Sequence, residues 1–360
     1  SEGAAATFSY TGGSVLIEVT EPTDRPWFVQ LDYVPPILLE TGKVYTVSFD
    51  AYATQARSIQ VKLGEYNRDL NGNGEMWDAY IQATANLTTQ SQSFSRDFGM
   101  AGPSDDGPEF SFFLGRERGD VTIDNVSLTE RDPVAISSAQ IPDAALRAAI
   151  ADELGVAESS LTDANLLSLE ELDAEDLGIT DLTGVELCQN LWELEANDNT
   201  LASLEPLAEH PALGDIELEN CGLAGAADLA PLATIPTLQR VELLQNDISL
   251  SDLQATFDPV THPNMRRLAV SNDFGTFDDI EALVDYVISF PTVTDIAIFE
   301  FGDTFGDGGV QYLYQELVAA GLDQQIADLK LRDNALTSDA LATIVQMEGI
   351  RWMSLSGNSF

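Results

Sequence analysis

The first third of the chain alternates apolar and polar residues in short runs that turn-forming residues separate. Alternation with a period of two predicts strands with one buried and one solvent-facing side. The predicted strands are Ser14–Val19, Trp27–Tyr33, Val44–Tyr52, Ser58–Gly64, Ala79–Thr84, Ser93–Gly99, Glu109–Gly115 and Asp120–Leu128. Eight short strands joined by turns indicate an all-β sandwich of jelly-roll type over residues 1–131.

From residue 166 to residue 360 the pattern is different. The spacing L-x-x-L-x-L-x-x-N-x-L recurs, and residues 191–201 (L-W-E-L-E-A-N-D-N-T-L) match it. About eight such turns begin at Leu169, Leu191, Leu213, Leu238, Met265, Val293, Ile326 and Ile350. The spacing lengthens from 22 residues to 33, and the longer turns contain helical patterns at 280–288 and 310–320. This repeat predicts an α/β solenoid, in which each turn packs only against its neighbours.

Residues 132–165 are expected to form a linker and a helical cap. Leu146, Ile150 and Leu154 fall on one apolar face, after the helix start Ile141-Pro142-Asp143 and before Gly155. Such a helix would cover the first turn of the solenoid, which otherwise exposes its core. The fold class is therefore two-domain, with an all-β sandwich followed by a capped solenoid.

The net charge of −44 comprises −10 in residues 1–131 and −34 in residues 132–360. A negative field of this size disfavours nucleic acid and anionic membranes as partners, and it attracts divalent cations and basic surfaces. Solubility in salty water is the plainer explanation of the charge. No apolar run reaches the length of a membrane-spanning helix.

Few residues suit catalysis or metal binding through nitrogen and sulfur. The two cysteines, Cys188 and Cys221, fall where a solenoid buries small residues, so we expect two buried free thiols rather than a disulfide. The two histidines, His210 and His262, each precede a proline in a turn. The sequence therefore contains too few histidines for a histidine-based metal site or a catalytic triad to be expected.

Four segments of the sandwich resemble a known family: P-W-F-V-Q-L (26–31), G-K-V-Y-T-V-S-F-D-A-Y-A (42–53), F-F-L-G (112–115) and G-D-V-T-I-D-N-V-S-L (119–128). They resemble carbohydrate-binding modules of the family 4/9/22 type, which have a galactose-binding-like jelly roll. The resemblance implies a non-catalytic module that binds β-glucan or xylan chains in a groove on its concave sheet. Family members usually begin with a strand of N-G-D-F-E type that is missing here, so we expect either a trimmed chain or a strand supplied from elsewhere.

Alternation predicts which strand residues face outward. It places Ile59, Val61, Leu63, Phe110, Phe112 and Leu114 in the core and Gln60, Lys62, Glu109, Ser111 and Phe113 outside. The resemblance implies sugar contacts at Trp27, Gln60, Glu109 and Phe113, and the aromatic residues Tyr66, Trp77 and Tyr80 would wall the groove. Aromatic rings stack on the apolar faces of sugars. The alternative for Trp27 and Trp77 is that they only cover the sandwich.

The segment D-L-N-G-N-G-E (69–75) offers oxygen ligands at Asp69, Asn71, Asn73 and Glu75, spaced as in the first half of an EF-hand loop. The twelfth position is Tyr80 rather than glutamate, and a loop rich in Asn-Gly turns explains the same residues. The module resemblance adds Asp124 as a structural calcium ligand. Calcium is therefore a possible structural cofactor.

The second half of the chain resembles bacterial internalin-like leucine-rich repeat proteins through I-P-D-x-x-L-R-x-A-I (141–150), I-T-D-L-T-G-V-E (179–186) and L-A-S-L-E-P-L-A (201–208). The strand positions of the first three turns would form an acidic concave face, with Glu171, Asp173, Glu193, Glu195, Asp215 and Glu217. This face is either a solvated surface adapted to salt or a docking site for a basic protein patch or calcium. The last turn ends at 358–360 without a C-terminal cap, which indicates truncation or completion by a neighbouring copy.

Together the two scaffolds predict a non-catalytic extracellular or cell-surface protein. The sandwich would bind a polysaccharide, and the solenoid would act as a docking or spacer arm for a protein partner or for self-association. The alternative is a structural or adhesive subunit of a surface layer or filament, assembled head-to-tail and calcium-dependent. An enzyme is not expected, since no segment outside the two scaffolds is left to hold a carboxylate pair.

Overall fold

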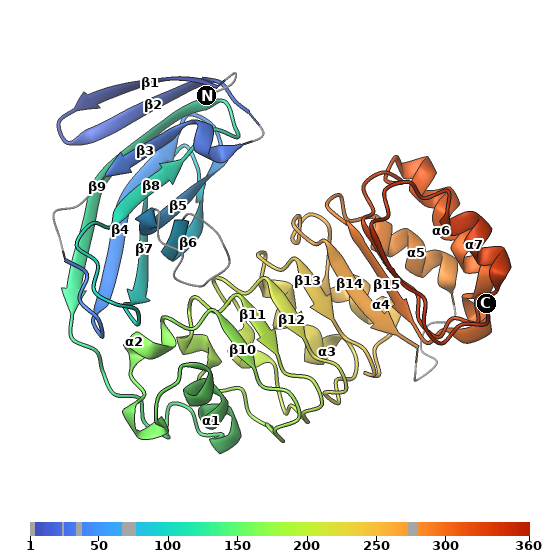
Figure 1. Cartoon of the computed structure of the whole chain (residues 1–360). Coiled ribbons are helices and arrows are strands. Elements are labelled where there is room, and N and C mark those ends of the chain that lie inside the picture. Colours follow the sequence, from blue (N-terminus) through green and yellow to red (C-terminus); the bar gives the residue numbers. More distant parts are fainter. Residues whose placement is uncertain (1–3, 24, 34–37, 67–76, 273–278) are drawn as a thin grey trace. The chain divides into compact units, whose positions relative to one another are not determined.

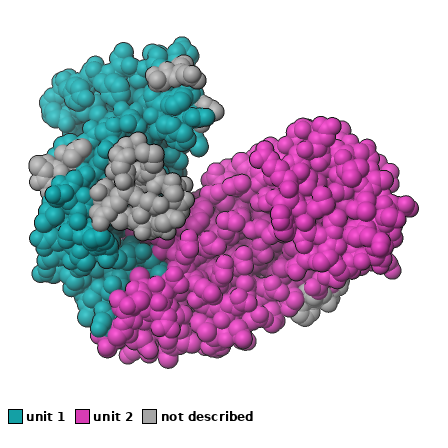
Figure 2. All heavy atoms as spheres, viewed as in Figure 1, with its two compact units in different colours: residues 1–136, 160–169 teal, residues 137–159, 170–360 magenta. Residues whose placement is uncertain are grey.

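The computed structural model describes residues 4–23, 25–33, 38–66, 77–272 and 279–360, and the chain divides into two compact units (Figures 1 and 2). Unit 1 comprises residues 1–136 and 160–169. Unit 2 comprises residues 137–159 and 170–360. None of the helices in the described part of the chain is long and apolar enough to cross a membrane.

Unit 1 contains a sandwich of two antiparallel sheets, which confirms the all-β prediction. One sheet has the strand order β1-β2-β9-β4-β7 and the other has the order β3-β8-β5-β6. The strands are β1 (Ala5–Thr11), β2 (Ser14–Glu21), β3 (Gln30–Tyr33), β4 (Val44–Ala53), β5 (Arg57–Tyr66), β6 (Trp77–Leu87), β7 (Gln92–Gly99), β8 (Glu109–Phe113) and β9 (Gly119–Arg131). All eight predicted strands are present, and β1 is an additional edge strand.

The core of the sandwich follows the predicted alternation. Tyr45, Phe49, Phe110 and Phe112 point inward and are buried. The rings of Phe49 and Phe112 meet edge to face across the two sheets, with centroids 5.0 Å apart, and Tyr45 stacks on Phe98. Aromatic pairs of this geometry add to the stabilisation that burial alone provides. The core therefore fixes which residues of each strand remain outside.

The segment before β3 departs from the prediction. A continuous strand over 27–33 was expected, but Pro26–Phe28 form one turn of 3₁₀ helix and the strand begins at Gln30. Pro26 stands at the first position of that turn, where its fixed φ and its missing N–H are tolerated. Because the turn breaks the alternation, Trp27 does not share the inward face on which a continuous strand would place it.

Residues 160–169 return to unit 1, which the sequence did not predict. The short helix α2 (Asp163–Leu166) packs against β7, and Ala164 forms a small apolar cluster with Val44 and Leu167. The carboxylate of Asp163 lies 2.6 Å from the guanidinium of Arg131. An ion pair at the surface contributes little by itself, so apolar packing is the main contact between this segment and the sandwich.

Unit 2 contains one parallel sheet whose eight strands lie in sequence order, β10 to β17. The strands are β10 (Glu171–Asp173), β11 (Glu193–Glu195), β12 (Asp215–Glu217), β13 (Arg240–Glu242), β14 (Arg267–Ser271), β15 (Asp295–Phe299), β16 (Asp328–Lys330) and β17 (Trp352–Ser354). Each strand begins two residues after the start of a predicted turn. The repeat and its register are therefore confirmed.

The helices of unit 2 are α1 (Ala144–Glu153), α3 (Ala226–Leu229), α4 (Leu250–Thr256), α5 (Ile280–Ile288), α6 (Gly306–Ala320) and α7 (Ser338–Ile344). The predicted helices at 280–288 and 310–320 correspond to α5 and to most of α6. Figure 1 shows α5, α6 and α7 gathered at the C-terminal end of the sheet. The helix α1 packs against β10 and is capped by Asp143, whose Oδ1 accepts hydrogen bonds from the backbone of Ala145 and Leu146.

Buried asparagines join successive turns of unit 2. The Asn246 side chain donates to the carbonyl of Leu218 at 2.7 Å, and its Oδ1 accepts from the backbone N–H groups of Cys221 and Leu223. Asn334 donates to the carbonyl of Ile298 in the same way. These bonds satisfy backbone groups that short strands leave unpaired. The asparagine of the repeat therefore joins neighbouring turns of the solenoid.

The two cysteines are buried and free, as expected. Burial raises the pKa of the Cys188 thiol to about 12 and that of Cys221 to about 11. Thiols with such pKa values stay protonated near neutral pH, and the thiolate is the reactive form. Both residues therefore serve the packing of the solenoid.

Candidate functional site

The outer face of the sheet β3-β8-β5-β6 carries two polar rows. One row crosses the sheet from Gln30 through Phe113 and Gln60 to Thr84, each residue opposite the next in register. The parallel row runs through Asp32, Ser111, Lys62 and Gln82. Because side chains alternate along a strand, both rows lie on the face opposite the core residues. Of the predicted sugar contacts, Gln60, Phe113 and Glu109 lie on this face.

Trp27 stands half exposed at one end of this sheet, with 50% of its surface accessible. Its turn is anchored to the end of β8, because the backbone N–H of Gly115 donates to the carbonyl of Pro26 at 2.8 Å. The guanidinium of Arg25 lies 5.9 Å from the centroid of the indole ring. The turn is therefore anchored to the sheet, and half of the Trp27 surface is accessible beside the Arg25 guanidinium.

A hydrogen-bonded cluster lies at the β3–β8 side of the face. The hydroxyl of Ser111 donates to Asp32 Oδ1 at 2.7 Å, and the Gln30 amide donates to Asp32 Oδ2 at 2.8 Å. Ser111 was expected to be exposed, but it is completely buried, because its short side chain lies beneath these longer neighbours. Alternation predicted the correct face for Ser111, but it cannot predict that longer side chains on the same face cover it.

Glu109 lies beside this cluster on β8. Its Oε1 is 3.5 Å from the Ser111 hydroxyl. Burial raises the pKa of Glu109, and the nearby negative charge of Asp32 raises it further. The face thus presents two neighbouring carboxylates, of which Glu109 is the one that takes up a proton more readily than an exposed glutamate.

For the other three predicted glycan-binding residues, the structure describes the side chain of Tyr80 only. Tyr66 and Trp77 lie opposite each other at the ends of β5 and β6, and their side chains lie outside the described part of the structure. Tyr80 stacks on Phe98 in the core and donates from its hydroxyl to Asp105 at 3.0 Å. A contact of any of the three with sugar stays a prediction.

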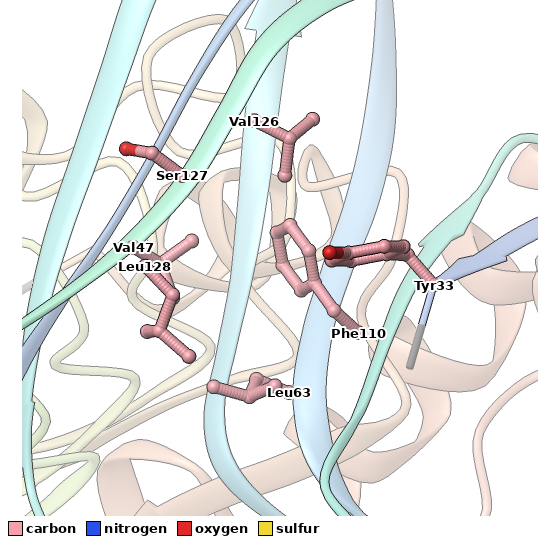
Figure 3. Close-up of a pocket in the computed structure, with 7 residues that line it drawn as sticks. All are labelled: Tyr33, Val47, Leu63, Phe110, Val126, Ser127 and Leu128. Atoms are coloured by element: carbon pink, nitrogen blue, oxygen red, sulfur yellow. The ribbon is translucent and has the colours of Figure 1, made fainter. Parts of the chain in front are cut away.

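A cavity of about 160 Å³ opens between the two sheets of unit 1. It is lined by Tyr33, Val47, Leu63, Phe110, Val126, Ser127 and Leu128 (Figure 3). In Figure 3 the rings of Tyr33 and Phe110 lie side by side, while the Ser127 hydroxyl points away from them and bonds the hydroxyl of Ser48. Tyr33 and Ser127 are the lining residues with side-chain hydroxyls, and that of Ser127 is already bonded to Ser48, so the cavity offers few partners for sugar hydroxyls.

The structure describes one of the five predicted calcium ligands, Asp124. Asp69, Asn71, Asn73 and Glu75 lie outside the described part of the chain. Asp124 accepts a hydrogen bond from the backbone of Asn125, and it faces Asp50 across the β4–β9 pair. Within the described residues, no group of three or more His, Cys, Asp or Glu side chains is arranged to hold a metal ion.

The open face of the parallel sheet in unit 2 has an acidic zone on its first three strands. Leu172, Leu194 and Ile216 form the buried column, and the residues on either side of each point to the opposite, open face. The acidic zone comprises Glu171, Asp173, Glu193, Glu195, Asp215 and Glu217, in register from β10 to β12. Burial and the neighbouring carboxylates raise the pKa of Glu195.

Basic residues enter this face only beyond the acidic zone. Arg240 lies 2.6 Å from Asp215, and Arg267 lies 3.1 Å from Glu242. The Lys330 ammonium lies 3.9 Å from the same Glu242. The face therefore changes from carboxylates alone on β10 and β11 to carboxylate–cation pairs at Asp215–Arg240 and Glu242–Arg267.

Comparisons with known proteins found a matching family model and several similar solved structures. Residues 1–122 match the model of a family described as a carbohydrate binding domain. A solved structure titled "CBM4 structure and function" is 28% identical, covers 36% of this chain and 78% of its own, and has a TM-score of 0.31. Internalin C2 from Listeria monocytogenes is 21% identical, with coverages of 62% and 97% and a TM-score of 0.41.

A third solved structure is the family 11 carbohydrate-binding module from Clostridium thermocellum in complex with a β-1,3-1,4-mixed-linked tetrasaccharide. It is 18% identical, with coverages of 36% and 84% and a TM-score of 0.28. No curated protein sequence matched the chain.

Proposed function

We propose that this protein is a non-catalytic, extracellular glycan-binding and protein-interaction protein. The glycan site is the outer face of the sheet β3-β8-β5-β6, and its ligand is a β-glucan or xylan chain. The observation that carries this proposal is the carbohydrate binding domain match over residues 1–122, since that range contains every strand of this sheet.

The chemistry of the face supports the proposal. Trp27 and Phe113 offer aromatic surface, and the rows around Gln60 and Asp32 offer amide, hydroxyl and carboxylate groups. A sugar ring presents an apolar face and a rim of hydroxyls, so it needs both kinds of partner on one surface. We propose that the glycan chain lies across the two polar rows, with one of its sugar rings stacked on the indole of Trp27.

Unit 2 is the docking or spacer arm in this proposal. The acidic zone on β10–β12 suits a basic patch on a partner protein, because opposite charges steer encounter and suppress wrong partners. The helix α1, which packs against β10, serves as the N-terminal cap of the solenoid. The sandwich of unit 1 is a jelly roll of the carbohydrate-binding type.

Isothermal titration calorimetry with laminarin, mixed-linkage β-glucan and xylan tests the glycan site. We expect binding of at least one glycan, and Trp27→Ala should weaken it about tenfold, because one stacked ring contributes about 1.4 kcal/mol. Trp352→Ala is a matched control, since Trp352 is 51% exposed but lies in unit 2. The proposal fails if none of the three glycans binds, or if both variants behave alike.

A structural calcium ion in unit 1 is the cofactor that we propose from the sequence. Thermal unfolding in calcium and in EDTA tests it, because a bound ion stabilises the folded state by mass action. A midpoint that rises with calcium in the wild type but not in Asp69→Ala would support the site. Equal midpoints in calcium and EDTA would count against it.

A further inference from the structure

Asp32 is a candidate specificity residue on the glycan face, and neither the repeat pattern nor the family motifs pointed to it. It lies on the edge strand β3, and its side chain is exposed. Both carboxylate oxygens are held, Oδ1 by the hydroxyl of Ser111 at 2.7 Å and Oδ2 by the amide of Gln30 at 2.8 Å. The carboxylate is therefore oriented before any ligand arrives.

An ionised carboxylate only accepts hydrogen bonds, and it has about four lone-pair sites. Ser111 and Gln30 occupy one site on each oxygen, so one site on each oxygen remains for a ligand. Two adjacent sugar hydroxyls are donors with a matching spacing, and hydrogen bonds to a charged acceptor are stronger than neutral ones. The geometry of Asp32 thus suits a pair of neighbouring hydroxyls.

The same arrangement disfavours an acidic sugar. A uronate carboxylate has no donor to offer, and its charge would meet Asp32 and the half-buried Glu109 on one face. Lys62 lies opposite Ser111 on β5, so the face also holds one cation. Among the described side chains of the two rows and Glu109, two carboxylates stand against one ammonium group, which leaves an excess of negative charge around Asp32.

We propose that Asp32, positioned by Gln30 and Ser111, makes this face select uncharged glycans with adjacent hydroxyl donors and reject glycans that carry carboxylates. This inference rests on the proposed glycan-binding function and adds the class of sugar to it. The selection is a local contact, distinct from the repulsion that the net charge of −44 exerts on any polyanion. Salt separates the two effects, because the Debye length falls to about 3 Å at 1 M.

The test compares matched glycan pairs by calorimetry in 1 M NaCl. Laminarin and mixed-linkage β-glucan are each paired with their C6-oxidised forms, and xylan is paired with glucuronoxylan. We expect the wild type to bind the neutral member at least about tenfold more tightly, since one unfavourable charge contact costs 1.4 kcal/mol or more. Asp32→Asn should weaken binding of the neutral glycan several-fold and bring the ratio within each pair towards one.

Asp120→Asn is the control variant, because it removes one carboxylate from β9 in the other sheet of unit 1 and should leave the ratio unchanged. Should Asp32→Asn alter thermal unfolding, Asp32→Ser removes the carboxylate with a smaller side chain and must lower the ratio likewise. Equal binding of neutral and acidic members by the wild type would overturn the inference, as would an unchanged ratio in a folded Asp32 variant. Failure of every neutral glycan to bind would instead overturn the proposed function itself.

Discussion

The carboxylate of Asp215 lies 2.6 Å from the guanidinium of Arg240, on neighbouring strands of the parallel sheet. Asp215 is only 1% exposed, and its Oδ1 has no hydrogen-bond partner among the described residues. Glu193 and Glu217 add negative charge around it. The pair stands at the edge of the acidic zone, where Arg240 and Arg267 stabilise a buried charge that Glu193 and Glu217 disfavour.

Replacing Arg240 by methionine should destabilise unit 2. The change leaves the Asp215 charge buried without its nearest cation, and breaking a buried ion pair from one side costs 3–5 kcal/mol. Because the Arg240 side chain is 40% exposed, we expect a loss of about 2 kcal/mol in the free energy of unfolding. Urea unfolding followed by circular dichroism measures it. The double variant with Asp215→Asn should recover most of the loss, whereas simple additivity of the two changes would contradict this account.

The stability of unit 2 should also depend on pH through Asp215. Burial raises its pKa to about 6, while Arg240 lowers it in part and Glu193 raises it. Since the folded pKa lies above the unfolded value of 3.8, the folded state binds more protons between these values. This contribution to stability is complete below pH 3.8 and is lost as the pH rises through about 6.

Thermal unfolding between pH 4 and pH 7 measures this dependence. Asp215→Asn should reduce the slope by up to about 1.4 kcal/mol per pH unit, the value for one proton. Glu195 and Glu242 also have raised pKa values, so a smaller slope of the same sign should remain in the variant. A slope unaffected by Asp215→Asn would show that another group carries it.

The strands and core residues of both units could be predicted from the sequence where their packing is local and periodic. In the solenoid each turn meets only its neighbours, so the leucine spacing predicted all eight strands. In the sandwich, alternation predicted Ile59, Val61 and Phe112 as core residues, and they are buried. The edge strand β1 was missed because its Phe8 and Tyr10 are exposed and give no clear apolar side. The turn signal Gly12-Gly13 would have indicated its hairpin with β2.

The candidate site was predicted only in part for the same physical reason. Gln60, Glu109 and Phe113 lie within regular strands, so alternation placed them on the correct face. Asp32 was not predicted, because alternation along residues 27–33 gives the face of each side chain but not its hydrogen-bond partners. The Asp32–Ser111 contact joins residues 79 apart in the chain, and no local pattern reports such a contact.

Asn246→Ala should destabilise unit 2 by about 2–4 kcal/mol. The buried side chain donates to the carbonyls of Leu218 and Leu244 and accepts from the N–H groups of Cys221 and Leu223. Each backbone group left buried without a partner costs about 1–3 kcal/mol, which water entering the gap recovers only in part. Chemical denaturation provides the measurement. As a control, Gln346→Ala removes one exposed bond to Ala342 and should stay within about 0.5 kcal/mol of the wild type.

Gly99→Ala should detach α2 from the sandwich or destabilise unit 1 by roughly 3 kcal/mol or more, because overpacking against rigid backbone leaves no side chain to move aside. A Cβ at Gly99 would lie 1.7 Å from the carbonyl oxygen of Ala164, a backbone atom of α2. Gly102→Ala is the matched control, since a Cβ there meets no atom within 4 Å. Hydrogen exchange of residues 160–169, together with thermal unfolding, distinguishes detachment from global loss. If Gly99→Ala leaves both unchanged, the close approach of α2 to β7 is not a feature of the protein in solution.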